Sequence, residues 1–347
     1  MILYRKAAPL RVRRSVAPAP PFWSATAVAP YGARRAAPVA IDYLALRATG
    51  VMDKLEVGVS DNVRDELERS RMLTAPVLID AAETAEVVFR RGEEVLEFCE
   101  EQRVAAVYLV STRGGVPLRA YDDAVVVISA WPLELGRLEE LFAEAKERGL
   151  RWGVAVPVLF PVTTDLAPLE TLADAAQTDG ASFLAAMSVE MEPTAKQALA
   201  QTLNLDADDD RYAMLFHAAL EPVHLATERH IAALAHERGM ADFIVPPRWD
   251  ERSNWNAAVL LTLAASRMIA MELDLDLAGT IAKSARVIAE LDKPLVRIFE
   301  SASLSIIGGL DDTSAEALTS WMADGTAEFC AFVDEQWRMR RGRMMTA

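Results

Sequence analysis

The sequence predicts an α/β fold, a TIM-like (β/α)6 partial barrel followed by a helical C-terminal extension. From about residue 74, short apolar, β-branched runs alternate with longer helical patterns at intervals of roughly 25 residues. Near-continuous apolar strands, each followed by a helix, are typical of a parallel sheet covered by helices. Repetition of one such unit favours a barrel or part of one. After about residue 190 the pattern becomes mostly helical.

The expected strands are short and rich in Val, Ile and Ala. They lie at residues 25–30, 76–80, 105–111, 124–129, 152–160, 181–187 and 242–245. Helices are expected at residues 62–72, 86–103, 134–149 and 166–178. The third of these is the clearest, because its apolar positions recur at helical spacing and Gly149 stands where a helix would end.

The C-terminal part predicts helices at residues 193–240, 255–292 and 313–337. A Pro-Pro-Arg-Trp-Asp loop at 246–250 separates the first two. In a barrel this loop would lie at the carboxyl ends of the strands, where ligands bind, or would pack on the barrel rim. The chain is therefore divided into a basic irregular arm (1–24), a partial barrel (25–250) and a helical extension (251–347).

Composition and charge restrict the function classes. Hydrophobic residues make up 52% and charged residues 25% of the chain, which is typical of a globular protein with a sizeable core. Residues 1–50 carry eight basic side chains and one acid, whereas the whole chain has a net charge of −15. The acidic remainder disfavours a nucleic-acid partner. The basic start is also similar to a transit peptide, but its prolines favour an irregular arm.

Other sequence features favour a cytoplasmic protein without a membrane span. No apolar run reaches the 18 residues of a transmembrane helix, and no secretory signal follows the first basic residues. Two cysteines are too few for a disulfide framework or an all-cysteine metal site. The four histidines (His217, His224, His230 and His236) are six or seven residues apart, about 9–10 Å along a helix, which is too far to share one ion.

Three segments form a further pattern. In the first, which follows the strand expected at 25–30, Ala33, Ala37 and Ala40 stand at A-x3-A-x2-A spacing after Pro30-Tyr31-Gly32. In the second, Asp80 ends a strand and Glu86 follows six residues later. The third runs from Ser111 to Arg119, at the end of the strand at 105–111, and contains Arg113 and Arg119. Ser129 follows at the end of the next strand, and Arg137 at the start of the next helix.

In order and spacing these segments resemble the radical S-adenosylmethionine (radical SAM) enzymes, and within them the spore-photoproduct-lyase-like group. That family carries C-x3-C-x2-C after its first strand, and here alanine stands at all three positions. The cysteines hold a [4Fe–4S] cluster with one iron open to chelate S-adenosylmethionine. The second segment is similar to Asp-Pro-Tyr-x-Pro-x-Glu, with Ala81 and Ala82 in place of Pro and Tyr.

The resemblance implies a cofactor-binding set of Asp80, Glu86, Arg113, Arg119, Ser129 and Arg137. Arg113 replaces a lysine that contacts the cofactor carboxylate, and an arginine keeps the charge and adds a bidentate fork. A cysteine-bearing parent would cleave S-adenosylmethionine reductively and abstract hydrogen from its substrate. This chain, which has no cluster ligands in the loop, is expected to be inactive in that reaction and to have no metal site there.

Alternatives remain open at this point. The alanines fit either an engineered cysteine-to-alanine variant of an active enzyme or a natural pseudoenzyme with a binding or scaffold role. A third reading is an unrelated barrel lyase or isomerase that uses acid–base carboxylates such as Asp80, Glu86 or Asp122. The expected partner is a small molecule or a peptide, and the sequence fixes neither the substrate nor the oligomeric state.

Overall fold

The computed structural model shows an α/β protein with a mostly parallel sheet. It describes the backbone of residues 12–13, 40–41 and 77–81, and most residues within 96–130, 134–158, 167–188 and 221–344. The strands are β1 (Val12–Arg13), β2 (Ala40–Ile41), β3 (Val77–Ala81), β4 (Ala106–Ser111), β5 (Ala124–Ser129), β6 (Trp152–Val158) and β7 (Leu184–Ser188). The α/β class predicted from the sequence is confirmed.

Strand order in the sheet follows chain order from β1 to β7. The β1–β2 pair is antiparallel, and every other neighbouring pair is parallel. The strands predicted from apolar runs are confirmed for β3 to β7, with ends that differ by at most three residues. β1 lies within the arm expected to be irregular, so at least this part of the arm joins the sheet.

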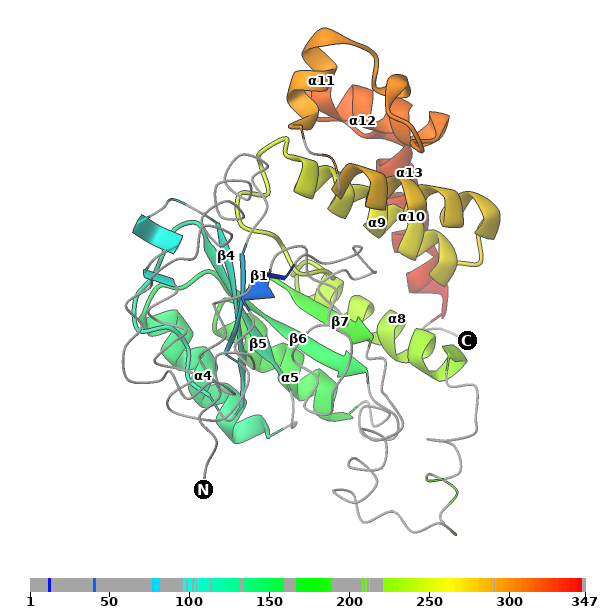
Figure 1. The fold of residues 1–347 in the computed structure, drawn as a ribbon. Helices are drawn as coiled ribbons and strands as arrows, with labels where there is room; N and C mark the ends of the chain where they lie inside the picture. Colours follow the sequence, from blue (N-terminus) through cyan, green and yellow to red (C-terminus); the bar gives the residue numbers. More distant parts are fainter. Residues whose placement is uncertain are drawn as a thin grey trace, which may run out of the picture.

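Helices cover one face of the sheet. They are α4 (Leu135–Glu147), α5 (Ala167–Thr178) and α8 (Glu221–Glu237). Leu138 and Phe142 of α4 are fully buried with Tyr108 and Ile128 of the sheet, and the Phe142 ring stacks on Trp152 at a centroid distance of 4.9 Å. Figure 1 shows α4 and α5 lying along this face.

The opposite face, called here the inner face, packs against α9 (Asn254–Ala270). Trp255, Val259 and Leu263 of α9 form a cluster with Val107, Leu109, Val125, Val127, Phe183 and other strand residues. The odd-numbered residues of β4 and β5 belong to this cluster and the even-numbered ones to the other core, as the alternation of side chains along a strand requires.

A second core lies among the C-terminal helices, and except for α9 these helices lie away from the sheet (Figure 1). These are α9, α10 (Leu275–Ala289), α11 (Leu295–Ser301), the 3-10 helix η1 (Leu304–Ile306), α12 (Asp312–Asp324) and α13 (Glu328–Met344). Because α9 contributes side chains to both cores, the extension is joined to the sheet and does not stand apart from it. Among the described helices, none has the length and apolar character needed to cross a membrane.

Three predictions about this region were wrong. The helix expected at 255–292 is broken between α9 and α10, where Glu272 and Asp274 have positive φ angles of 54° and 33°. The helix expected at 313–337 is also two helices, because Gly325 ends α12 in the left-handed conformation. Residues 242–245 form no strand; only Ala241 makes an isolated bridge, to Phe183.

Candidate functional site

Small side chains form a row across the inner face, level with the carboxyl end of β5. Ser129 pairs in register with Ala155, and Ala155 with Ala185, so the three are level across β5, β6 and β7. The next row toward the amino ends contains the bulky Val127 and Phe183. Ligands of parallel α/β folds bind at the carboxyl ends of the strands. Within this row, Ser129 is therefore the residue that lies where such ligands bind.

Ser129 is the most informative residue in this row. Its side chain is fully buried, and within the described part of the chain its Oγ has no hydrogen-bond partner. Leaving a buried hydroxyl unsatisfied costs about 1–3 kcal/mol, so an orphan of this kind calls for an explanation. A ligand atom that reaches Oγ would supply the missing hydrogen bond.

Two arginines at opposite ends of α4 hold the β4–β5 loop that lies beside this row. Arg137 donates from Nε to the Thr112 carbonyl (3.3 Å) and from Nη2 to the Gly114 carbonyl (3.0 Å). Arg148 donates from Nη1 to the carbonyls of Val116 (2.7 Å) and Pro117 (3.0 Å). Arg137 therefore fixes the backbone on both sides of position 113 and acts as a support of the loop.

Arg119, also expected to bind the cofactor, is held elsewhere. Its guanidinium pairs with Glu97 and Glu100, each at 3.2 Å, and its side chain is 51% exposed. These glutamates belong to the helical segment that precedes β4. The structure does not bring Arg119 together with Ser129.

The remaining predicted positions lie partly outside the described residues. Ala33, Ala37, Glu86 and Arg113 lie outside them, so their mutual arrangement is not tested. Asp80 lies in β3, in register with Leu109 of β4.

Ala40 lies in β2, in register with Leu78. Leu78 is in turn paired with Val107 near the amino end of β4. The expectation that position 40 belongs to a loop beyond a strand end is therefore not met, because this residue takes part in strand pairing.

The side chains present do not fit an iron–sulfur cluster. An alanine methyl cannot ligate iron, and the cysteines are buried in different cores, Cys99 beside the sheet and Cys330 in α13. Burial raises the pKa of each thiol to about 12, which disfavours the thiolate that binds metals. Among the described residues, no three His, Cys, Asp or Glu side chains are grouped so that they could hold an ion.

The loop at 246–250 lies at the amino ends of the strands, and its expected place at the carboxyl ends was wrong. Arg248 forms an ion pair with Asp123, directly before β5, and donates to the Arg103 carbonyl shortly before β4 (3.2 Å). The hydrogen bond from the Arg248 guanidinium to the Asp123 carboxylate holds the pKa of Asp123 below its usual value. Buried Asn256 of α9 donates to the carbonyls of Arg248 (2.7 Å) and Glu251 (2.8 Å).

The proposed acid–base residue Asp122 lies in the same turn as Asp123, exposed and at the amino end of β5. It is therefore separated by the length of the strand from Ser129.

Comparisons with protein-family models, with curated proteins and with solved structures found no match to this chain.

Proposed function

We propose that this chain is a radical-SAM-type partial barrel that carries no cluster and binds S-adenosylmethionine, or a small ligand of the same chemistry, without cleaving it. The ligand would lie at the carboxyl ends of the strands on the inner face. On this proposal the protein acts as a binding protein or pseudoenzyme. Reductive cleavage would need an electron delivered through a cluster that these side chains cannot hold.

The observation that carries the proposal is the orphaned Oγ of Ser129. A hydroxyl at the end of a buried strand can donate to a carboxylate oxygen, and the family resemblance assigns a serine near this position to the cofactor carboxylate. The parallel sheet, with strand order equal to chain order, also supports a barrel-type wall. Ala155 and Ala185, at the two neighbouring register positions, are small side chains buried in the inner-face cluster.

The β4–β5 loop would supply the second contact. Arg137 holds the carbonyls of Thr112 and Gly114, which flank Arg113 on both sides. A loop whose backbone is already held in place loses less entropy on binding a ligand than a loop that is not held. Under this proposal Arg113 pairs with the ligand carboxylate, and Arg137 is a positioning residue.

The proposal is tested by calorimetric titration of the purified chain with S-adenosylmethionine. We expect saturable binding, and in Ser129→Ala a loss of about tenfold or more in affinity, as for a hydrogen bond to a charged group. Thr262→Val is the matched control, because Thr262 on α9 also has a buried hydroxyl without a partner in the described part of the chain. Its affinity should equal that of the parent.

Absence of binding to the parent chain, or equal affinities in Ser129→Ala and the parent, would overturn the proposal.

The origin of the alanines is tested separately. Ala33, Ala37 and Ala40 are changed together to cysteine, and the protein is reconstituted anaerobically with iron and sulfide. The broad absorbance of a [4Fe–4S] cluster together with formation of 5′-deoxyadenosine would identify an enzyme parent. A folded variant that takes up no iron would support a scaffold that never used the cluster.

A further inference from the structure

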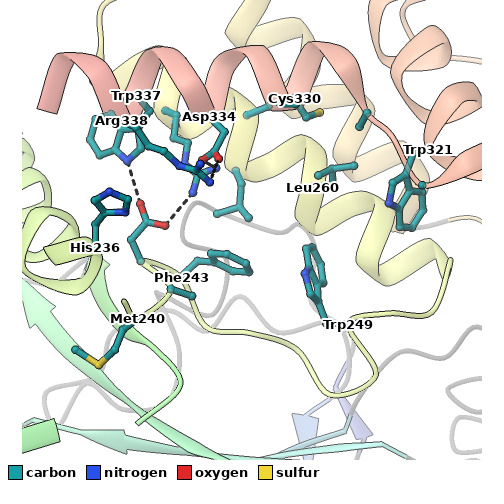
Figure 2. A pocket seen from close by; sticks show the side chains of 18 residues that line it. His236, Met240, Phe243, Trp249, Leu260, Trp321, Cys330, Asp334, Trp337 and Arg338 are labelled. Carbon is teal, nitrogen blue, oxygen red and sulfur yellow. Dashed lines mark hydrogen bonds and ion pairs between the residues drawn. The ribbon is translucent and has the colours of Figure 1, made fainter. Parts of the chain in front are cut away.

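A pocket of about 490 Å³ lies where the amino ends of the strands meet the C-terminal helices. Its walls come from the end of α8, the segment at 240–249, α9, α12 and α13. Figure 2 shows Phe243, Trp249, Leu260 and Trp321 arranged around its space. The volume lies within the range of about 300–1,000 Å³ typical of small-molecule sites.

The aromatic walls are only partly covered by protein. Phe243 and Trp249 meet edge to face, with ring centroids 5.5 Å apart, and both are partly buried. Trp321 is also partly buried, and it comes from α12, on the other side of the pocket. Aromatic rings brought together from separate elements and left partly uncovered are suited to stack on a flat ring.

The polar end of the pocket is a network of opposite charges. Arg267 donates to Asp242 and to Asp334, each at 2.8 Å, and its side chain is only 14% exposed. Trp337 donates from Nε1 to the second oxygen of Asp242 at 2.9 Å (Figure 2). Arg338 pairs with the second oxygen of Asp334.

Among the described residues at this end, two carboxylates (Asp242 and Asp334) balance two guanidinium groups (Arg267 and Arg338). Each carboxylate oxygen can still accept more than one hydrogen bond. The network therefore presents acceptors to a ligand without attracting an ion of either sign.

We propose that this pocket binds an uncharged, planar aromatic compound that carries an N–H or O–H donor. The ring stacks against Trp321 and Trp249, and the donor reaches a carboxylate oxygen of the Arg267 network. The site is independent of the proposed function. Asp242 follows the residue that bridges to the start of β7, whereas Ser129 lies at the carboxyl end of β5.

The ligand class is tested with four probes in calorimetry and ligand-observed NMR. Indole is flat and has a donor, N-methylindole lacks the donor, indole-3-acetate adds a negative charge, and tryptamine adds a positive charge. We expect indole to bind with a dissociation constant of about 1 mM or tighter. N-methylindole should bind about fivefold more weakly, which is the net effect of one hydrogen bond.

The position of the site is tested with two tryptophan substitutions of exposed alanines. Ala331 of α13 lines the pocket, so Ala331→Trp should fill it and weaken indole binding at least tenfold. Ala323 of α12 is equally exposed and is not among the lining residues, so Ala323→Trp should bind as the parent does. Neither change removes a core contact, and near-ultraviolet circular dichroism checks the fold.

A second variant, Trp321→Ala, removes one wall and should also weaken indole binding. Equal binding in Ala331→Trp and Ala323→Trp would overturn the position. Tighter binding of either charged probe than of indole, or equal binding of N-methylindole, would overturn the ligand class.

Discussion

The two ends of the parallel sheet differ in what their inner-face residues do. At the amino ends, the Phe183 ring lies over Gly153, and Arg248 pairs with Asp123. At the carboxyl end of β5, Ser129 is level with the small Ala155 in the middle of β6, and the serine hydroxyl has no partner within the described residues. One end is closed by bulky packing and ion pairing, and the other carries small side chains and an unsatisfied donor.

This difference implies that residues at the amino end of a strand serve mainly stability and residues at its carboxyl end serve mainly ligand binding. Parallel α/β folds place their binding residues at the carboxyl ends of the strands. Large side chains and ion pairs at the amino ends therefore do not interfere with ligand binding. Substitutions at the amino ends should therefore change mainly the free energy of unfolding. Substitutions at the carboxyl ends should change mainly ligand affinity.

The largest effect is expected from Gly153→Ala. A Cβ at this position would lie 2.5 Å from the Phe183 ring, which is itself fully buried in the inner-face cluster. The ring would have to move within a packed core, and such overpacking typically costs about 1–3 kcal/mol. We expect a loss near the upper end of that range in the free energy of unfolding, measured by urea denaturation.

Gly279→Ala in α10 is the control, because nothing lies within 4 Å of a Cβ built there and alanine favours a helix. It should leave stability unchanged or raise it slightly. In a Phe183→Leu background, the cost of Gly153→Ala should shrink, since the two sites are in contact. An unchanged cost in that background would mean that the ring does not account for the glycine.

A smaller effect is expected from Asp123→Asn, which breaks the pair with Arg248. The pair is partly exposed, with 32% of the Asp123 side chain and 20% of the Arg248 side chain accessible, so the loss should be about 1 kcal/mol. The folded pKa of Asp123 is lowered, chiefly by its hydrogen bond with Arg248. Its contribution is therefore present above the ordinary pKa of aspartate and is lost as the pH falls toward the lowered folded value.

The measurement is the midpoint of urea unfolding between pH 7 and pH 3. The parent and Asp123→Asn should differ at neutral pH and converge in acid. Asp122→Asn changes the exposed neighbouring carboxyl in the same turn and should follow the parent throughout. A constant difference between parent and Asp123→Asn down to pH 3 would contradict the assignment.

The sequence predicted the parts of the fold that depend on local pattern. The apolar run at 124–129 matches β5, because a short run rich in β-branched residues favours a strand covered on both faces. The segment at 242–245 has a similar apolar pattern but is not a strand. Asp242 binds Arg267 and Trp337, which lie 25 and 95 residues away along the chain. Interactions at such separations leave no local signal.

The candidate site was predictable to a similar extent. Ser129 could be placed at a strand end and Arg137 at a helix start from the alternation alone. The partners of Arg137 are two backbone carbonyls, which no side-chain pattern reveals. The loop at 246–250 was expected at the wrong end of the strands, because the sequence did not indicate that Arg248 would pair with Asp123 before β5.

The smallest effect on stability is expected from Arg119→Ala. This variant distinguishes Arg119 from Arg137, the two described arginines of the expected cofactor-binding set. Arg119 pairs with exposed glutamates on the surface, and such pairs contribute about 0.5 kcal/mol or less. Its S-adenosylmethionine affinity should equal that of the parent. Arg137→Ala frees the carbonyls of Thr112 and Gly114 and should weaken binding severalfold, because the loop at position 113 is no longer held. If Arg119→Ala weakened binding as much as Arg137→Ala, the ligand would have to reach the surface near Glu97, and the carboxyl-end site would be misplaced.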